Sequence, residues 1–180
     1  IATMVSNDGN GLWDCEEAAC NHWCISGCSQ AQWAACWDVG APQCVNGQCY
    51  TPIVIDVLGD GIKLTNAQQG VRFNIINKLA WTTPDSDDAW LTLDRNGNGS
   101  IDGGEELFGN SSPQPSPPTG VVKNGFLALA EYDRSANGGN SDGVINPSDA
   151  IFTSLLLWQD TNHNGVSESS ELKRLQSLCV

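Results

Sequence analysis

Residues 94–105 combine oxygen-bearing side chains and glycines in the order that a calcium loop requires. Calcium takes about six to eight oxygen ligands at about 2.3–2.6 Å, and this spacing wraps them around one point. Gly99 stands at the sixth position, where the backbone turns sharply, and Ile101 is apolar at the eighth. The predicted ligands of this loop I are Asp94, Asn96, Asn98, the Ser100 carbonyl, Asp102 and Glu105.

Residues 160–171, here loop II, repeat the same order of oxygens around Gly165. The departure is Ser167 at the eighth position, where an apolar residue usually joins a short strand pairing between two loops. The predicted ligands are Asp160, Asn162, Asn164, the Val166 carbonyl, Glu168 and Glu171.

Residues 133–149, here loop III, hold a distorted copy. Counting back from Gly143 puts Gly138, which has no side-chain oxygen, at the first position. Asp133 can supply that ligand if residues 134–139 form an expanded bulge, for which their Asn and Gly content is suited. The alternative is a glycine-rich connector. The predicted ligands are Asp133, Asn140, Asp142, the Val144 carbonyl, Asn146 and Asp149.

Two further segments are loop-like. Near the start, the predicted ligands are Asp8, Asn10, the Leu12 carbonyl, Asp14 and Glu17, with only Ser6 at the first position. The acids of that segment would equally suit the first turn of a helix. Residues 56–61 put Leu58 at the third position and have no acid at the twelfth. We interpret them as a strand end and turn in which Asp56 or Asp60 could bind a metal.

Composition favours a metal-loaded, secreted chain. Twenty-one acidic residues against eight basic ones give a formal charge of −13, which speaks against nucleic-acid binding. About three calcium ions, or four with the N-terminal segment, would neutralise much of that charge and couple folding to metal binding. No apolar run approaches the roughly 18 residues of a membrane span.

The eight cysteines predict disulfides formed in an oxidising, extracellular compartment. Seven lie between Cys15 and Cys49, and the spacing does not decide which pair with which. Zinc is the rival, with Cys20, His22 and Cys24 close in sequence, but paired CxxC spacing is missing. The predicted disulfide residues are Cys15, Cys20, Cys24, Cys28, Cys36, Cys44, Cys49 and Cys179.

The expected organisation is a disulfide-stapled helical cap (residues 1–50) followed by a calcium-binding domain (residues 51–180). Residues 52–57 predict a strand, residues 70–76 suggest another, and residues 111–119 are a proline-rich extended connector. Apolar residues at helical spacing predict helices beside the loops. The predicted fold class is therefore α+β, mainly helical, with EF-hand-like loops and a few short strands. The helically spaced residues are Phe126, Leu127, Ala130, Ile151, Leu155, Trp158, Leu172 and Leu175.

From Pro52 to Leu178 the sequence resembles the EF-hand-like calcium modules of secreted bacterial proteins. The motifs that carry the resemblance occur in order: VIDVLGDGIKLT, GVRFN, DDAWLTLDRNGNGSIDGGEELFG, GFLALAEYD, GGNSDGVINPSDAIF and LLLWQDTNHNGVSESSEL. The chain is also similar to the self-processing module of RTX-type proteins. That resemblance implies calcium-promoted cleavage of an Asp-Pro bond just ahead of the first strand.

The chain departs from that pattern at the scissile bond. The corresponding dipeptide is Thr51-Pro52, and the sequence contains no Asp-Pro pair. Threonine lacks the carboxylate that would attack its own peptide carbonyl, so we expect no cleavage. P-loop, HExxH and nucleophile-elbow motifs are also missing, and we expect no other enzyme activity.

We therefore expect an extracellular or cell-surface module with a structural or adhesive role. Self-assembly, including filament formation, and binding of another extracellular protein are the expected partnerships. The alternatives are a self-processing module without its scissile site, and a calcium-responsive interaction module. A single Met, Met4, argues against the Met-rich groove of a calcium sensor.

Overall fold

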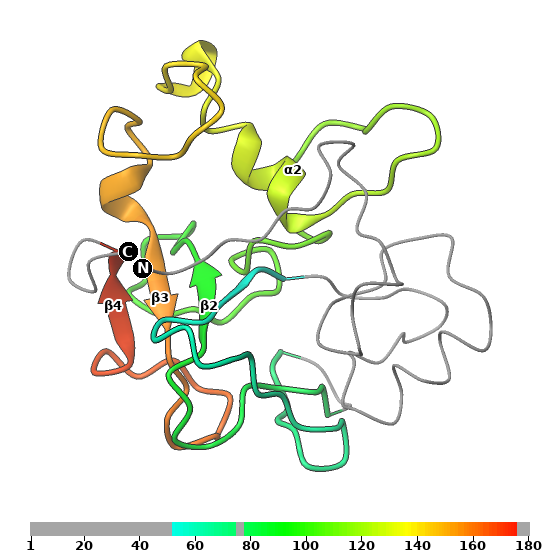
Figure 1. Ribbon diagram of the computed structural model, residues 1–180, viewed down its shortest axis with the longest axis vertical. Coiled ribbons are helices and arrows are strands. Elements are labelled where there is room, and N and C mark those ends of the chain that lie inside the picture. Colours follow the sequence, from blue (N-terminus) through cyan, green and yellow to red (C-terminus); the bar gives the residue numbers. More distant parts are fainter. Residues whose placement is uncertain (1–51, 75–77, 176–180) are drawn as a thin grey trace.

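The computed structural model describes residues 52–74 and 78–175 (Figure 1). The predicted cap, all eight cysteines and the N-terminal loop-like segment lie outside these residues. In the described part, four strands form one antiparallel sheet in the order β1-β2-β3-β4. The strands are β1 (Val54–Ile55), β2 (Ala89–Thr92), β3 (Leu156–Trp158) and β4 (Leu172–Arg174).

The sheet buries side chains on both of its faces. Successive side chains of a strand point to opposite faces, and all four residues of β2 are buried. On one face, Leu91 and Leu157 join a core with Phe108 and Leu129. On the other, Trp90 and Trp158 oppose each other in the β2–β3 register and pack with Trp81 and Phe73. A strand that is buried on both faces has a continuous run of apolar residues in its sequence, as in Leu155-Leu156-Leu157-Trp158 at β3.

One short α-helix, α2 (Gly125–Ala130), contributes Ala128 and Leu129 to the core on the first of these faces. Asn124 caps it by accepting a hydrogen bond from the Leu127 N–H at 3.0 Å. Gly125 is needed because a Cβ there would lie 2.2 Å from the Phe108 carbonyl oxygen. Two short 3₁₀ helices, η1 (Ser135–Asn137) and η2 (Phe152–Ser154), also lie in the described part of the chain.

The predicted mainly helical fold is wrong, because the described chain is built on the sheet. A helix forms at 125–130, but its buried residues are Gly125, Ala128 and Leu129, whereas Phe126 is 36% exposed. The other helically spaced apolar residues belong to η2, β3 and β4 or their ends. The reason is that apolar spacing in short segments does not distinguish a helix from a strand: Leu155 and Trp158 are spaced as on a helix, but residues 156–158 form β3, which pairs with β2.

The predicted strand at residues 52–57 is confirmed in its centre by β1. Of the suggested second strand at 70–76, the structure describes residues 70–74, which form an antiparallel bridge between Val71 and Leu79. Within the described ranges, no helix is long and apolar enough to cross a membrane.

Candidate metal centres

One residue, Leu93, separates the end of β2 from loop I, whose first carboxylate organises the turn. Asp94 Oδ1 accepts the Gly97 N–H at 2.7 Å, and Asp94 Oδ2 accepts the Gly99 N–H at 2.8 Å. Gly99 has φ = +83°, a conformation that favours glycine. The Asn98 amide donates to Asp102 Oδ2 at 2.9 Å. The structure therefore gathers the predicted oxygens of Asp94, Asn98 and Asp102 in one tight turn.

The acid that closes loop I against its own backbone is Glu106, one residue beyond the predicted Glu105. Glu106 is 1% exposed, and its carboxylate accepts the N–H groups of Arg95 at 3.1 Å and Asp102 at 2.8 Å. Glu105 is exposed and lies over Gly103, where a Cβ would meet Glu105 Oε1 at 2.5 Å. The turn between the Gly103 carbonyl and the Glu106 N–H, at 2.9 Å, brings the later glutamate inward.

Loop II joins β3 to β4 as the connection of an antiparallel hairpin. Asp160 Oδ2 accepts the Gly165 N–H at 2.9 Å, and Asn164 donates to Glu168 Oε1 at 2.8 Å. That bond from Asn164 holds the pKa of Glu168 below its usual range. Glu171 is 5% exposed and accepts the Thr161 N–H at 3.0 Å, so the predicted twelfth-position acid faces its loop.

Loop III has the expanded form that the sequence allowed. Asp133 Oδ2 accepts the Gly143 N–H at 2.9 Å, although ten residues separate the two. Residues 134–139 loop out through η1, and the Ser141 N–H returns to the Asp133 carbonyl at 2.7 Å. Asp149 is 2% exposed and accepts the Asn146 N–H at 2.7 Å. The structure thus brings Asp133 into the place of the missing first ligand.

The three loops share one hydrogen-bond pattern despite their different sequences. In each, the first Asp accepts the N–H of the sixth-position glycine: Gly99, Gly165 or Gly143. In each, the fifth and ninth side chains are hydrogen-bonded to each other. Val144 and Val166, at the seventh position, are each 57% exposed, and because valine has no side-chain oxygen they can offer the loop only their carbonyl oxygens.

Loops I and II are joined through their eighth positions. The Ser167 hydroxyl accepts the Ile101 N–H at 2.6 Å and donates to the Ile101 carbonyl at 3.1 Å. Ser167 is 7% exposed. A side-chain hydroxyl thereby bonds both backbone groups that a neighbouring strand would otherwise bond, which accounts for a serine at a position that is usually apolar.

The oxygen atoms gathered in these loops are suitable ligands for a hard divalent cation. The closing acids Glu106, Asp149 and Glu171 are nearly fully buried, and the donors to them described above are neutral N–H groups. In loop II, Glu168 Oε2 is buried and has no hydrogen-bond partner. A buried carboxylate without a compensating positive charge is costly, and a cation coordinated by oxygen removes that cost.

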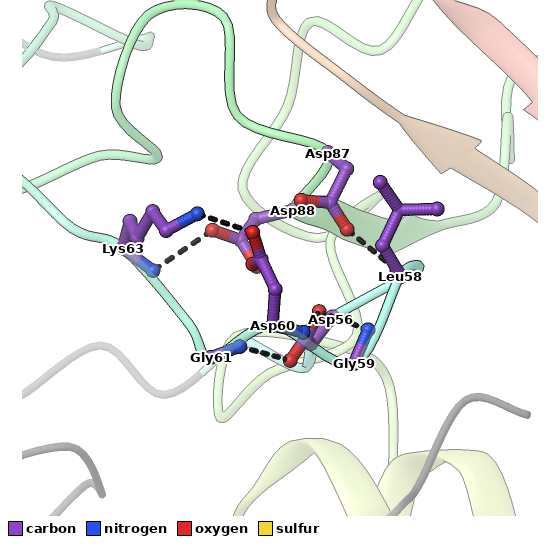
Figure 2. A network of polar contacts seen from close by, with 8 residues as sticks. All are labelled: Asp56, Leu58, Gly59, Asp60, Gly61, Lys63, Asp87 and Asp88. Carbon is purple, nitrogen blue, oxygen red and sulfur yellow. Dashed lines mark hydrogen bonds and ion pairs between the residues drawn. The ribbon is translucent and has the colours of Figure 1, made fainter.

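A fourth carboxylate group lies where β1 ends (Figure 2). Asp56 Oδ1 accepts the Gly59 N–H at 2.7 Å and Asp56 Oδ2 accepts the Gly61 N–H at 2.7 Å, as the first Asp of loop I does. Carboxylate oxygens of Asp56, Asp60 and Asp87, here the Asp56 cluster, lie within 4.8 Å of one another. Burial acts to raise the pKa of Asp56, but the N–H groups of Gly61, Gly59 and Asp60 outweigh it and lower that pKa.

Asp88, next to this cluster, is buried at 1% exposure. Desolvation, with the negative charges of Asp87 and Asp56, raises its pKa to about 6 against the opposing hydrogen bond from the Lys63 N–H. The raised pKa means that the folded chain holds a proton from about pH 4 to about pH 6 that the unfolded chain has lost.

Without divalent cations, the free energy of unfolding should therefore fall as the pH rises through this interval. An isolated group with this shift would account for about 3 kcal/mol. Asp88→Asn should remove that decline, so the variant should exceed the wild type in stability near pH 7 and match it near pH 4. Urea unfolding at low temperature across the pH range measures the difference. Asp85→Asn, in the same turn but exposed, is the control; equal slopes for wild type and Asp88→Asn would contradict the assignment.

His163 anchors loop II to the segment before β2. Its two ring nitrogens lie 2.9 Å from the Thr82 carbonyl oxygen and 2.8 Å from that of Gln69. Residues 69 and 82 lie far from loop II in the sequence, so this contact and that of Ser167 with Ile101 tie the loop to distant segments of the chain.

Three features of this geometry do not follow from counting positions along the chain. Glu106 is offset by one residue from the twelve-residue spacing. Asp87 reaches the Asp56 cluster from a separate segment, which no local motif shows. The double hydrogen bond of Ser167 had a signal in the sequence, namely a polar residue at a usually apolar position.

Comparison with known proteins places these loops in a family. A family model described as the SPM domain matches residues 53–180. The iron-regulated protein FrpA of Neisseria meningitidis serogroup C is 38% identical over 138 residues, which cover 73% of this chain and 12% of FrpA. The chain thus spans about an eighth of the length of this relative. From the extent of the family match, the chain belongs to the SPM domain family.

Proposed function

We propose that the chain is a calcium-binding module that calcium stabilises in an extracellular setting. The observation that carries this proposal is the shared pattern of loops I, II and III. Each closes a turn of oxygen-bearing side chains with an acid that is at most 5% exposed. Three separate segments with different flanking structure would have no common reason to adopt this pattern other than a common ligand.

The ligand set supports weak rather than tight sites. Asn supplies side-chain oxygens at the third position of each loop and at the fifth position of loops I and II. Asn is neutral, and calcium affinity falls as fewer carboxylates contribute. We propose dissociation constants in the range of extracellular modules, about 10⁻⁴–10⁻³ M. The proposed ligands are those predicted from the sequence, with Glu106 in place of Glu105 in loop I.

A structural role is favoured over a sensor role. Sensor EF-hands respond by changing the angle between two helices. Loops I and II follow strands of one sheet, and loop II lies between the paired strands β3 and β4. Binding there would hold the sheet together rather than expose a groove.

Self-processing is the second candidate, because of the family match. We propose that this chain does not cleave itself, since Thr51 stands before Pro52 and offers no carboxylate. The module would then act through its surface, by self-assembly or by binding another extracellular protein.

Native mass spectrometry with and without a chelator tests both points. We expect calcium-dependent addition of at least three ions and an unchanged covalent mass after incubation with calcium. Asp94→Asn and Asp160→Asn should each remove one ion. Fragments or new cross-linked species on adding calcium would instead establish processing, and the absence of bound ions would refute the proposed function.

A further inference from the structure

The turn at Asp56 is built like the first half of loop I but lacks the third-position oxygen. That position is Leu58, which is 76% exposed. Asp87, which lies 29 residues further along the chain, approaches the place of the missing oxygen. Its Oδ2 accepts the Leu58 N–H at 2.6 Å. A carboxylate from a second segment thus stands where a contiguous loop would place its own side chain (Figure 2).

The spacing of the Asp56 cluster suits one ion. Oxygens bound to a single calcium at about 2.4 Å lie no more than about 4.8 Å apart, which is twice that distance. One carboxylate oxygen each from Asp56, Asp60 and Asp87 meets this limit. Asp60 also bonds the Lys63 ammonium through Oδ2 at 2.6 Å, and the two side chains are about half exposed. Such an exposed pair contributes little and yields readily to a divalent cation.

Asp88 gives an independent indication of a missing cation. It is 1% exposed, and while Oδ2 accepts the Lys63 N–H at 2.8 Å, Oδ1 is buried without any hydrogen-bond partner. In Figure 2 its carboxylate is drawn among those of the cluster, and the charges of Asp87 and Asp56 act on it. A buried, unpartnered carboxylate oxygen beside other acids is costly, and a cation between them offsets that cost.

We propose that Asp56, Asp60 and Asp87 hold a calcium ion, with the buried Asp88 carboxylate beside the site. This site differs from loops I, II and III because its ligands come from two separate segments, one after β1 and one before β2. Occupancy would therefore fasten the edge strand β1 to its neighbour β2, with which it pairs over only two residues. The inference rests on the proposed calcium binding and adds a site to it.

Asp87→Asn tests the site, with Asp85→Asn as the matched control. Both changes remove one negative charge from the same turn, and Asp85 lies outside the cluster. The side-chain amide oxygen that Asp87→Asn introduces can still accept the Leu58 N–H, so the backbone contact is kept. By native mass spectrometry in calcium, Asp87→Asn should carry one ion fewer than the wild type, and Asp85→Asn should carry the same number.

Leu58→Asp is the complementary variant, because it restores a third-position oxygen at an exposed residue. It should strengthen calcium binding at this site by about tenfold and return the lost ion to the Asp87→Asn chain. Suppose that Asp94→Asn and Asp160→Asn each lose an ion, but Asp87→Asn loses none and Leu58→Asp gains no affinity. Loops I and II then bind calcium, and only the site at the Asp56 cluster is refuted. If the wild type binds no ion, the proposed function falls with it.

Discussion

Removing calcium should lower the melting temperature of the intact chain by about 25 °C. A ligand present at about 100 times its dissociation constant stabilises the folded state by about 2.7 kcal/mol per site, so three sites give about 8 kcal/mol. In a chain of this size, about 1 kcal/mol corresponds to about 3 °C in melting temperature. Differential scanning calorimetry with excess calcium and with chelator gives the value directly.

The physical cause is the charge of the chain. Its formal charge is −13, and the acids that close loops I, II and III are buried. Without a cation, burial of these carboxylates and their mutual repulsion oppose folding. Magnesium at the same concentration is the control, because it demands an octahedral shell of short bonds and should stabilise much less. A shift of only a few degrees with calcium would mean that the loops do not bind it in the folded chain.

Glu106→Gln should weaken calcium binding at loop I by about 100-fold, whereas Glu105→Gln should change it by less than about threefold. Both variants lose one negative charge in adjacent residues. Glu106 is 1% exposed and bonds the backbone of its loop, whereas Glu105 is exposed. The amide that Glu106→Gln introduces would also direct N–H donors at backbone N–H groups that now bond the carboxylate, which costs about 1–3 kcal/mol of stability.

Isothermal titration calorimetry of the two variants separates these effects, with Asp160→Asn serving to identify the heat that comes from loop II. Chemical unfolding in chelator measures the metal-independent part of the loss. If Glu105→Gln proves the more damaging change, the twelve-residue count is correct and the inward position of Glu106 serves the backbone alone.

The spacing of residues along the chain was enough to predict most of the loop geometry. The first Asp, the sixth-position glycine and the fifth and ninth side chains are fixed by short-range hydrogen bonds, so their order along the chain is enough to predict their arrangement. The same holds for β1, where β-branched residues between turn residues predicted a strand. Even the looping out of residues 134–139 was foreseeable, because Asp133 was the nearest acid able to replace Gly138.

The fold class was predicted wrongly because apolar spacing is ambiguous in short segments. Leu155 and Trp158 are three residues apart, as on a helix, yet the apolar run between them forms β3 and is buried on both faces of a sheet. The segment forms a strand because it pairs with β2, a contact between residues more than sixty positions apart. The same limit applies to Asp87, whose role depends on a segment that no local pattern connects to Asp56.

The contact between Trp158 and Glu171 has a practical consequence. The indole N–H of Trp158 lies 3.3 Å from Glu171 Oε2, in a cluster where its ring centroid is 5.3 Å from that of Trp81. Filling loop II would draw electron density on that carboxylate toward the ion and weaken its bond to the indole. The protein thus carries a native optical probe in β3, and the wavelength and intensity of its ultraviolet emission should follow occupancy of loop II without any added label.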